Sequence, residues 1–220
     1  MSLKPRNIAI IGLGSFGTAL ARELTRMGDR VLGIDILEKP VQSISDELDA
    51  SLQADARDIK ALKQCGLENY DSTIVSIGEN VEASLLAAVN VLELNCPQIW
   101  VKAQTSTHEK ILRAVGITNI VQPEESFGLR LAQFIHNPFM KDFMNLGNGF
   151  YIAQIAVQHT MADKRVETLK QLKKHKVKCV GVAFEDQIIQ PEDLDRPLET
   201  SDTLLLHGKR TDLRLFANDI

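Results

Sequence analysis

The run from Ile8 to Gly17, IAIIGLGSFG, constrains the fold of this chain more than any other stretch. Its four leading apolar residues are typical of a strand that is buried on both faces of a parallel sheet. Three glycines follow with the spacing G-x-G-x-x-G and lead into residues 18–24, which have a helical pattern. The sequence therefore predicts a strand, a tight turn and a helix whose free N–H groups face an anion.

Each glycine of this run has its own role in such a turn. Gly12 permits the turn, Gly14 lets a pyrophosphate approach the backbone, and Gly17 lets the helix lie close on the strand. A second apolar strand ends in Asp35, close to the spacing of ~20 residues at which an acid hydrogen-bonds a ribose diol. We therefore predict a nucleotide site. The alternative is a glycine turn in a doubly wound sheet that binds nothing.

Strand and helix patterns alternate six times in the first half of the chain. The predicted strands cover residues 8–11, 31–34, 51–54, 73–77, 99–103 and 119–121. Short loops between buried strands and helices are typical of an α/β fold with right-handed crossovers. We predict a Rossmann-like doubly wound parallel sheet in strand order 3-2-1-4-5-6.

The chain changes character after the sixth strand. An apolar stripe at helical spacing runs from Phe127 to Ile135, Asn137-Pro138 interrupts it, and residues 139–144 continue as a second aromatic helix. We expect this helical crossover to pack against a second subunit; the alternative is a linker that folds back on its own domain.

Gly147-Asn148-Gly149 is interpreted as a boundary, beyond which the pattern predicts a small α+β domain of order β-α-β-β-β-α. The expected domains are therefore a nucleotide-binding domain over residues 1–136, a crossover over 137–149 and a C-terminal domain over 150–220.

Charge and hydropathy argue against two classes of function. The net charge of −4 over 220 residues gives no basic footprint, so no nucleic-acid partner is expected. No apolar run approaches the ~20 residues of a membrane helix, so any membrane role must go through a partner chain. The three cysteines show no metal-ligand spacing and are typical of reduced cytosolic thiols.

Short motifs follow the glycine run in a fixed order: Asp35, Asp55-Ala56, Ser76-Ile77-Gly78, Val101-Lys102-Ala103 and Pro123-Glu124. With the crossover and the small tail, this order resembles the RCK (regulator of conductance of K⁺) family, whose two parts are the TrkA-N and TrkA-C domains. It looks most like the regulatory subunits of Ktr/Trk-type bacterial potassium uptake systems.

The resemblance implies a function without catalysis. In that family the first domain binds ATP and ADP or NAD(H), the crossover forms a homodimer, and four dimers form an octameric ring. Ligand exchange reshapes the ring and gates an integral-membrane potassium-translocating subunit. We therefore expect a cytoplasmic subunit that is peripheral to the inner face of the membrane. An NAD-dependent oxidoreductase and a redox-sensing or DNA-binding regulator are the competing hypotheses.

The resemblance also implies which residues contact the cofactor. The implied set comprises the phosphate loop Gly12, Gly14, Ser15, Phe16 and Gly17; Asp35 at the ribose; Asp55 and Ala56 at the adenine; Ser76, Ile77 and Gly78 in the pocket wall; and Lys102 at the phosphates. Many Ktr-type members carry an arginine where this chain has Ser15, which leaves both ATP selectivity and NAD(H) binding open.

The resemblance also implies a metal-binding role for Glu124, near the phosphates, and three of the implied residues have alternative interpretations. Lys102 contacts phosphate or forms a surface salt bridge, and Asp55 lies at the adenine or caps a helix from Ile59. Glu124 helps to hold Mg²⁺ or Ca²⁺ at the subunit boundary, or is a carboxylate stabilised by the dipole of its helix.

Overall fold

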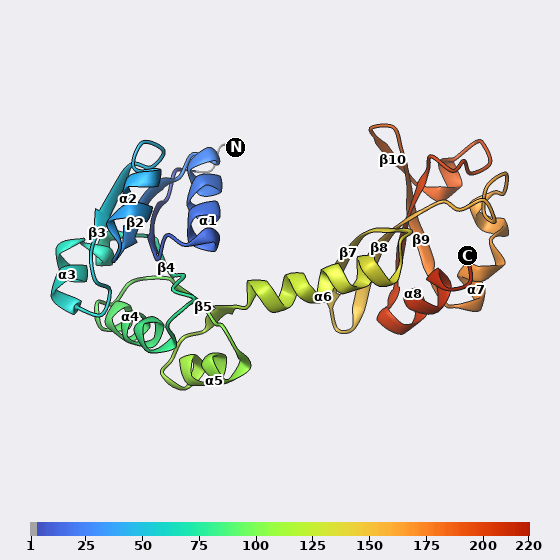
Figure 1. The fold of residues 1–220 in the computed structure, drawn as a ribbon. Helices are drawn as coiled ribbons and strands as arrows, with labels where there is room; N and C mark the ends of the chain where they lie inside the picture. Colours follow the sequence, from blue (N-terminus) through green and yellow to red (C-terminus); the bar gives the residue numbers. More distant parts are fainter. Residues whose placement is uncertain (1–3) are drawn as a thin grey trace. The chain divides into compact units, whose positions relative to one another are not determined.

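A computed structural model describes residues 4–220 of the chain. The chain divides into two compact units, of which the first ends at Glu124 and the second begins at Glu125 (Figure 1). In the described part, no helix combines the length and the apolar character needed to cross a bilayer.

The first unit is built on a six-stranded parallel sheet. Its order is β3-β2-β1-β4-β5-β6, as predicted. The strands are β1 (Asn7–Ile11), β2 (Arg30–Asp35), β3 (Ala50–Gln53), β4 (Ser72–Val75), β5 (Ile99–Lys102) and β6 (Asn119–Val121). β1 pairs with β2 on one side and with β4 on the other, so the strand order reverses at β1.

Helices cover both faces of this sheet. They are α1 (Ser15–Arg26), α2 (Glu38–Ile44), α3 (Ile59–Gln64), α4 (Val81–Glu93) and α5 (Ser106–Ala114), with a 3-10 turn at Leu67–Asn69. One core packs α1 and α2 against alternate residues of the sheet, and a second core packs α3, α4 and α5 against the others. Burial on both faces explains why these strands have continuous apolar runs.

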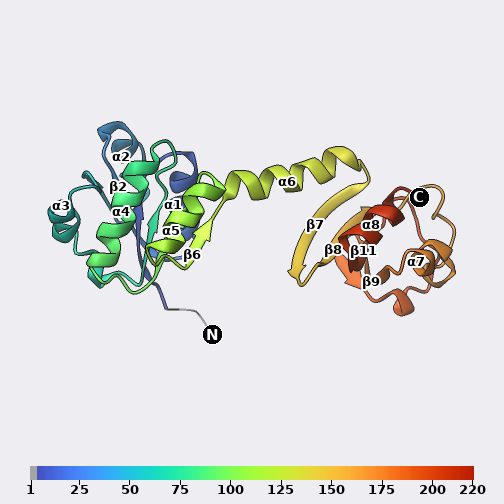
Figure 2. The ribbon, with the colours of Figure 1, turned by 90° about the horizontal axis from the view of Figure 1, so that it is seen from below.

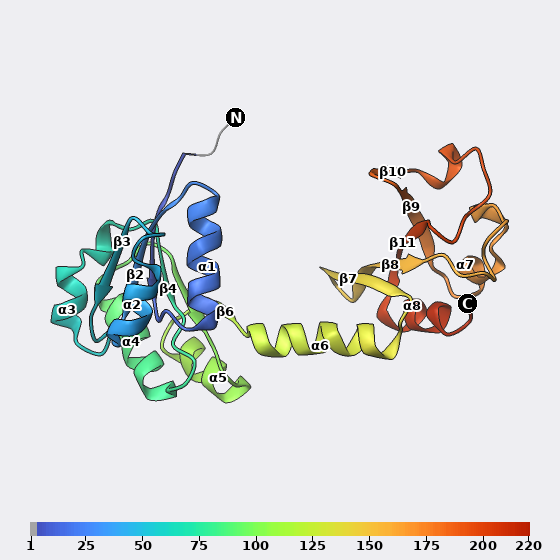
Figure 3. The ribbon, with the colours of Figure 1, turned by 45° about the horizontal axis from the view of Figure 1, so that its top comes forward.

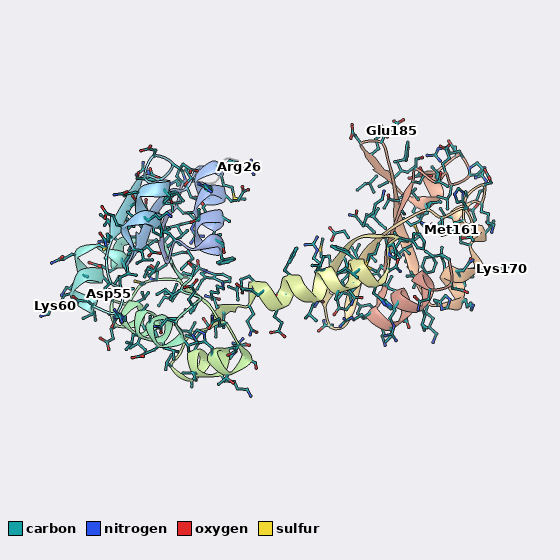
Figure 4. The ribbon with its side chains drawn as sticks, viewed as in Figure 1. Arg26, Asp55, Lys60, Met161, Lys170 and Glu185 are labelled. Carbon is teal, nitrogen blue, oxygen red and sulfur yellow. The ribbon has the colours of Figure 1, made fainter. Side chains whose placement is uncertain are left out.

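The second unit contains an antiparallel sheet in the order β10-β9-β11-β8-β7, with β10 and β7 at its edges (Figure 3). Its elements are β7 (Met140–Gly147), β8 (Phe150–Ala156), α7 (Lys170–Lys174), β9 (Lys178–Phe184), β10 (Gln187–Ile189), β11 (Thr203–Lys209) and α8 (Arg210–Ala217), with 3-10 turns at Val166–Thr168 and Pro191–Asp193. Met161 is fully buried in its core (Figure 4). From residue 150 onward the order is the predicted β-α-β-β-β-α.

Two expectations for the crossover are wrong. Residues 139–144 are not a second helix, because α6 (Pro123–His136) leads through a turn into strand β7 (Figure 2). Gly147-Asn148-Gly149 is not a boundary but the turn of the β7–β8 hairpin, in which Gly147 pairs with Phe150. Asn148 and Gly149 both have positive φ, 52° and 77°, as a two-residue hairpin turn requires.

Helix α6 exposes apolar side chains. None of its residues is buried, and Phe127 and Ile135 are 61% and 74% exposed. Met144 and Leu146 of β7 are exposed as well. Exposed apolar residues, where they gather on one surface, are typical of an interaction site.

Candidate functional site

A cavity of about 490 Å³ opens beyond the carboxyl ends of β1 and β4. Ligands of doubly wound sheets bind at such a reversal of strand order, and small-molecule pockets typically measure roughly 300–1,000 Å³. Predicted site residues that line this cavity are Gly12, Gly14, Asp35, Asp55, Ala56, Ser76, Ile77 and Gly78. The structure therefore gathers residues from four separate segments of the sequence around one space.

The remaining predicted residues lie outside the cavity lining. Ser15, Phe16 and Gly17 form the start of α1, immediately after Gly14. Lys102 is the last residue of β5, and Glu124 lies in the first turn of α6.

The glycine loop is shaped by backbone contacts. Gly12 has a φ of +98°, and its N–H donates to the carbonyl of Ile34 over 2.7 Å. The Ser76 hydroxyl donates to the carbonyl of Gly12. A Cβ on Gly17 would lie 1.9 Å from that carbonyl oxygen, so α1 can approach the turn only because residue 17 has no side chain.

The start of α1 fits a phosphate group. Gly14 is its N-cap residue, no side chain caps the helix, and its first turn contains no acidic residue. A Cβ on Gly14 would meet no atom within 4 Å, so the space beside this residue, which lines the cavity, is open. Free N–H groups and the positive end of the helix dipole both attract an anion there.

Asp35 connects β2 to the glycine loop. Its two carboxylate oxygens accept hydrogen bonds from the N–H groups of Leu13, over 2.7 Å, and Leu37, over 2.9 Å. Each carboxylate oxygen can accept more than one hydrogen bond, so the group can also receive a ribose hydroxyl. The predicted ribose acid is thus also part of the loop's own structure.

Asp55, in the loop between β3 and α3 (Figure 4), is engaged by Arg57. The Arg57 side chain donates to both Asp55 oxygens, its Nη2 over 2.7 Å, and this side-chain hydrogen bonding lowers the pKa of Asp55. Asp58, not Asp55, caps α3, by accepting from Lys60 N–H. The alternative interpretation of Asp55 as a helix cap is therefore wrong.

Lys102 and Glu124 form an ion pair. The ammonium of Lys102 is a hydrogen-bond donor to Glu124 Oε1, and this bond lowers the pKa of Glu124. Lys102 is buried, with 7% of its surface exposed, whereas the Glu124 side chain is 66% exposed, so the salt bridge joins a buried cation to a carboxylate at the surface. Its Nζ lies 5.6 Å from the centroid of the Phe16 ring and would be 3.1 Å from a Cβ on Gly78.

Within residues 4–220, no three His, Cys, Asp or Glu side chains are grouped as ligands for a metal ion. The carboxylate of Glu124 is bonded to Lys102. A divalent cation at Glu124 would therefore need further ligands from another source, such as the phosphate oxygens of a bound ligand.

The prediction missed several lining residues. Ile36, Leu37 and Pro40 add an apolar wall, and Arg57 and Asn80 add polar groups. Ile36 and Leu37 are 48% and 61% exposed. Two apolar residues directly after a strand-terminal acid were the signal available in the sequence for this wall.

The model of the TrkA-N domain matches residues 8–123. The chain is 30% identical over 220 residues to "Ktr system potassium uptake protein A" of Bacillus subtilis (strain 168), covering 99% of this chain and 98% of that protein. It is 28% identical to the protein of the same name from Vibrio alginolyticus, covering 97% of each.

Solved structures show the same fold. "GsuK Channel" has a TM-score of 0.67 at 16% identity and covers 96% of this chain. "GsuK channel bound to NAD" has a TM-score of 0.66 at 16% identity and covers 97% of this chain. The present chain spans 39% of the chain in each of these structures.

Gly14 and Gly17 should respond differently to the same added methyl group. Gly14→Ala should leave the stability nearly unchanged, because its Cβ meets open space and its φ is −66°, but should weaken phosphate binding by tenfold or more, roughly 1.4 kcal/mol. Gly17→Ala should destabilise the first unit by about 1–3 kcal/mol through its backbone clash. Denaturant unfolding and ADP titration measure the two effects, with adenosine as the phosphate-free control. Equal stability losses would contradict this assignment.

Proposed function

The chain belongs to the TrkA-N domain family, and on this basis we propose that it is a nucleotide-binding regulatory subunit of a Ktr-type potassium uptake system. The observation that carries the proposal is the cavity at the strand-order reversal, with the open start of α1 at one end and Asp35 in its lining. The names of relatives that match nearly the whole chain support the transport role.

The proposed ligand is an adenine nucleotide, either ATP and ADP or NAD(H). Asp35 would accept the adenosine ribose hydroxyls, Ala56 and Ile77 would contact the base, and the first N–H groups of α1 would hold the phosphates. The solved structure "GsuK channel bound to NAD" has the same fold, which supports this class of ligand.

The proposed subunit performs no chemistry on its ligand. Occupancy would instead favour one of two shapes of the assembly, and this shape would act on an integral-membrane potassium-translocating partner from the cytoplasmic side. A single ligand typically supplies ~1–3 kcal/mol of coupling, whereas a shift from 1:99 to 99:1 needs roughly 5.5 kcal/mol. Several sites in one ring would supply the difference.

An NAD-dependent oxidoreductase is the competing function. It would need a proton donor placed beside the nicotinamide. Incubation with NAD and a panel of alcohols and 2-hydroxy acids, followed by the absorbance of the reduced cofactor, tests it. Sustained turnover would overturn the regulatory proposal.

The ligand assignment predicts a preference between two dinucleotides. NAD should bind the nucleotide-stripped protein at least about tenfold more tightly than NADP, because the 2′-phosphate would meet the Asp35 carboxylate. Asp35→Ala should weaken NAD binding and reduce this preference, since the charged acceptor of the ribose hydroxyls is lost. Calorimetry measures both affinities, and unfolding checks the variant because Asp35 also binds Leu13 and Leu37. Equal affinities for NAD and NADP in the native chain would count against the site.

The exposed apolar residues of α6 and β7 support the proposed assembly. Four apolar side chains of α6 are among the exposed large residues of the chain: Phe127, Leu129, Leu131 and Ile135. We propose that they pack against the equivalent residues of a second copy, and that four such dimers form an octameric ring.

The isolated protein should therefore be dimeric or larger. Light scattering at micromolar concentration measures this, and Phe127→Glu with Ile135→Glu should shift the protein toward monomer, because charges disfavour burial of this surface. Ile188→Glu, at an equally exposed apolar residue of β10, is the matched control. A native chain that stays monomeric would contradict the assembly.

Ser15 predicts weak discrimination between ATP and ADP. The start of α1 supplies only about half a positive charge, and serine adds none, so the extra phosphate of ATP depends on Lys102 or on a cation near Glu124. Without metal, the two affinities should differ by less than about tenfold, roughly 1.4 kcal/mol. Mg²⁺ or Ca²⁺ should widen the difference, and Glu124→Gln should remove this widening.

Ser15→Arg should restore ATP preference without metal, because a guanidinium forms paired, charge-assisted bonds with phosphate. Titration of the stripped native and variant chains with both nucleotides measures this. If Ser15→Arg changes neither affinity, residue 15 does not face the phosphates.

A further inference from the structure

Lys102 is a buried cation that lies between two parts of the first unit. One is the carboxylate of Glu124, whose side chain is 66% exposed. The other is the glycine loop: Nζ lies 5.6 Å from the Phe16 ring centroid and against the space above Gly78, a residue of the cavity lining. The same ammonium therefore adjoins both the first turn of α6 and the phosphate end of the site.

Because it is buried, the Lys102 ammonium needs an anionic partner. A buried ammonium without an anionic partner is costly, and in the structure Glu124 supplies that partner. Glu124 can leave the pair at lower cost, because its exposed carboxylate can return to water. A phosphate at the start of α1 would provide Lys102 with a second anion.

We propose that a ligand phosphate replaces Glu124 as the ion-pair partner of Lys102. Lys102 thereby selects for phosphate, and the loss of its bond to Glu124 releases the first turn of α6. This inference rests on the proposed nucleotide site and specifies how that site is regulated. Glu124 then opposes phosphate binding when no metal is present. By reciprocity, anything that draws Glu124 away from Lys102 strengthens phosphate binding.

The test compares ADP with adenosine on the nucleotide-stripped full chain in metal-free buffer. Glu124→Gln should tighten ADP binding by about tenfold and leave adenosine unchanged, because the amide no longer holds the ammonium. Lys102→Met should weaken ADP binding by a similar factor. In the double variant with Lys102→Met, Glu124→Gln should not increase ADP affinity, since the cation that Glu124 holds in the native chain is absent.

Glu125→Gln is the matched control. It removes the same charge from the adjacent exposed residue, which is not in the Lys102 pair. Its ADP affinity should remain near that of the native chain. A gain in ADP affinity equal to that of Glu124→Gln would show a general charge effect and overturn the proposed change of partner at Lys102.

Amide hydrogen exchange provides a second measurement. ADP should increase exchange in the peptide that covers residues 123–130 of the native chain, and adenosine should not. Unchanged or weaker ADP binding in Glu124→Gln would overturn the proposed change of partner alone. Unchanged hydrogen exchange in this peptide would do the same. Failure of adenosine, ADP and NAD to bind the native chain would overturn the proposed function and this inference together.

Discussion

The close approach of α1 to the turn after β1 is the constraint on which the first unit depends. A Cβ at residue 17 would lie 1.9 Å from the Gly12 carbonyl, so this packing admits glycine alone. Ser76 donates to the same carbonyl, and Asp35 accepts from Leu13. Contacts from the end of β2 and from the residue after β4 thus hold the loop at the centre of the sheet, beside the cavity.

Acidic side chains line this cavity, and electropositive groups lie beside it. Asp35, Asp55 and Glu79 are among its lining residues, and the positive charge of Arg57 is bonded to Asp55. The start of α1 is electropositive, and Lys102 lies beside Gly78. In the proposed site, these acidic groups would receive ligand hydroxyl groups, and the start of α1 with Lys102 would receive phosphates.

The sequence predicted the parts of the fold in which local pattern and tertiary burial agree. The buried strands of the first sheet and the glycine spacing lead to one strand order, and the structure has it. Residues 140–144 belong to strand β7 and not to the predicted helix, because pairing with β8 across the Asn148-Gly149 turn, a strong hairpin signal, outweighs their helical aromatic spacing. The Lys102–Glu124 pair could not be predicted, since each residue has a sufficient explanation without the other and only the tertiary structure brings them together.

Glu124 links the phosphate end of the site to the proposed subunit contact through the chain itself. It lies in the first turn of α6, and the exposed apolar residues proposed for the dimer follow it in the same helix. One ion pair changes the free energy of a conformation only modestly, because an exposed carboxylate recovers hydration when the pair breaks. A regulatory effect therefore requires that many copies change together, and a symmetric assembly through α6 would make each local exchange part of one transition.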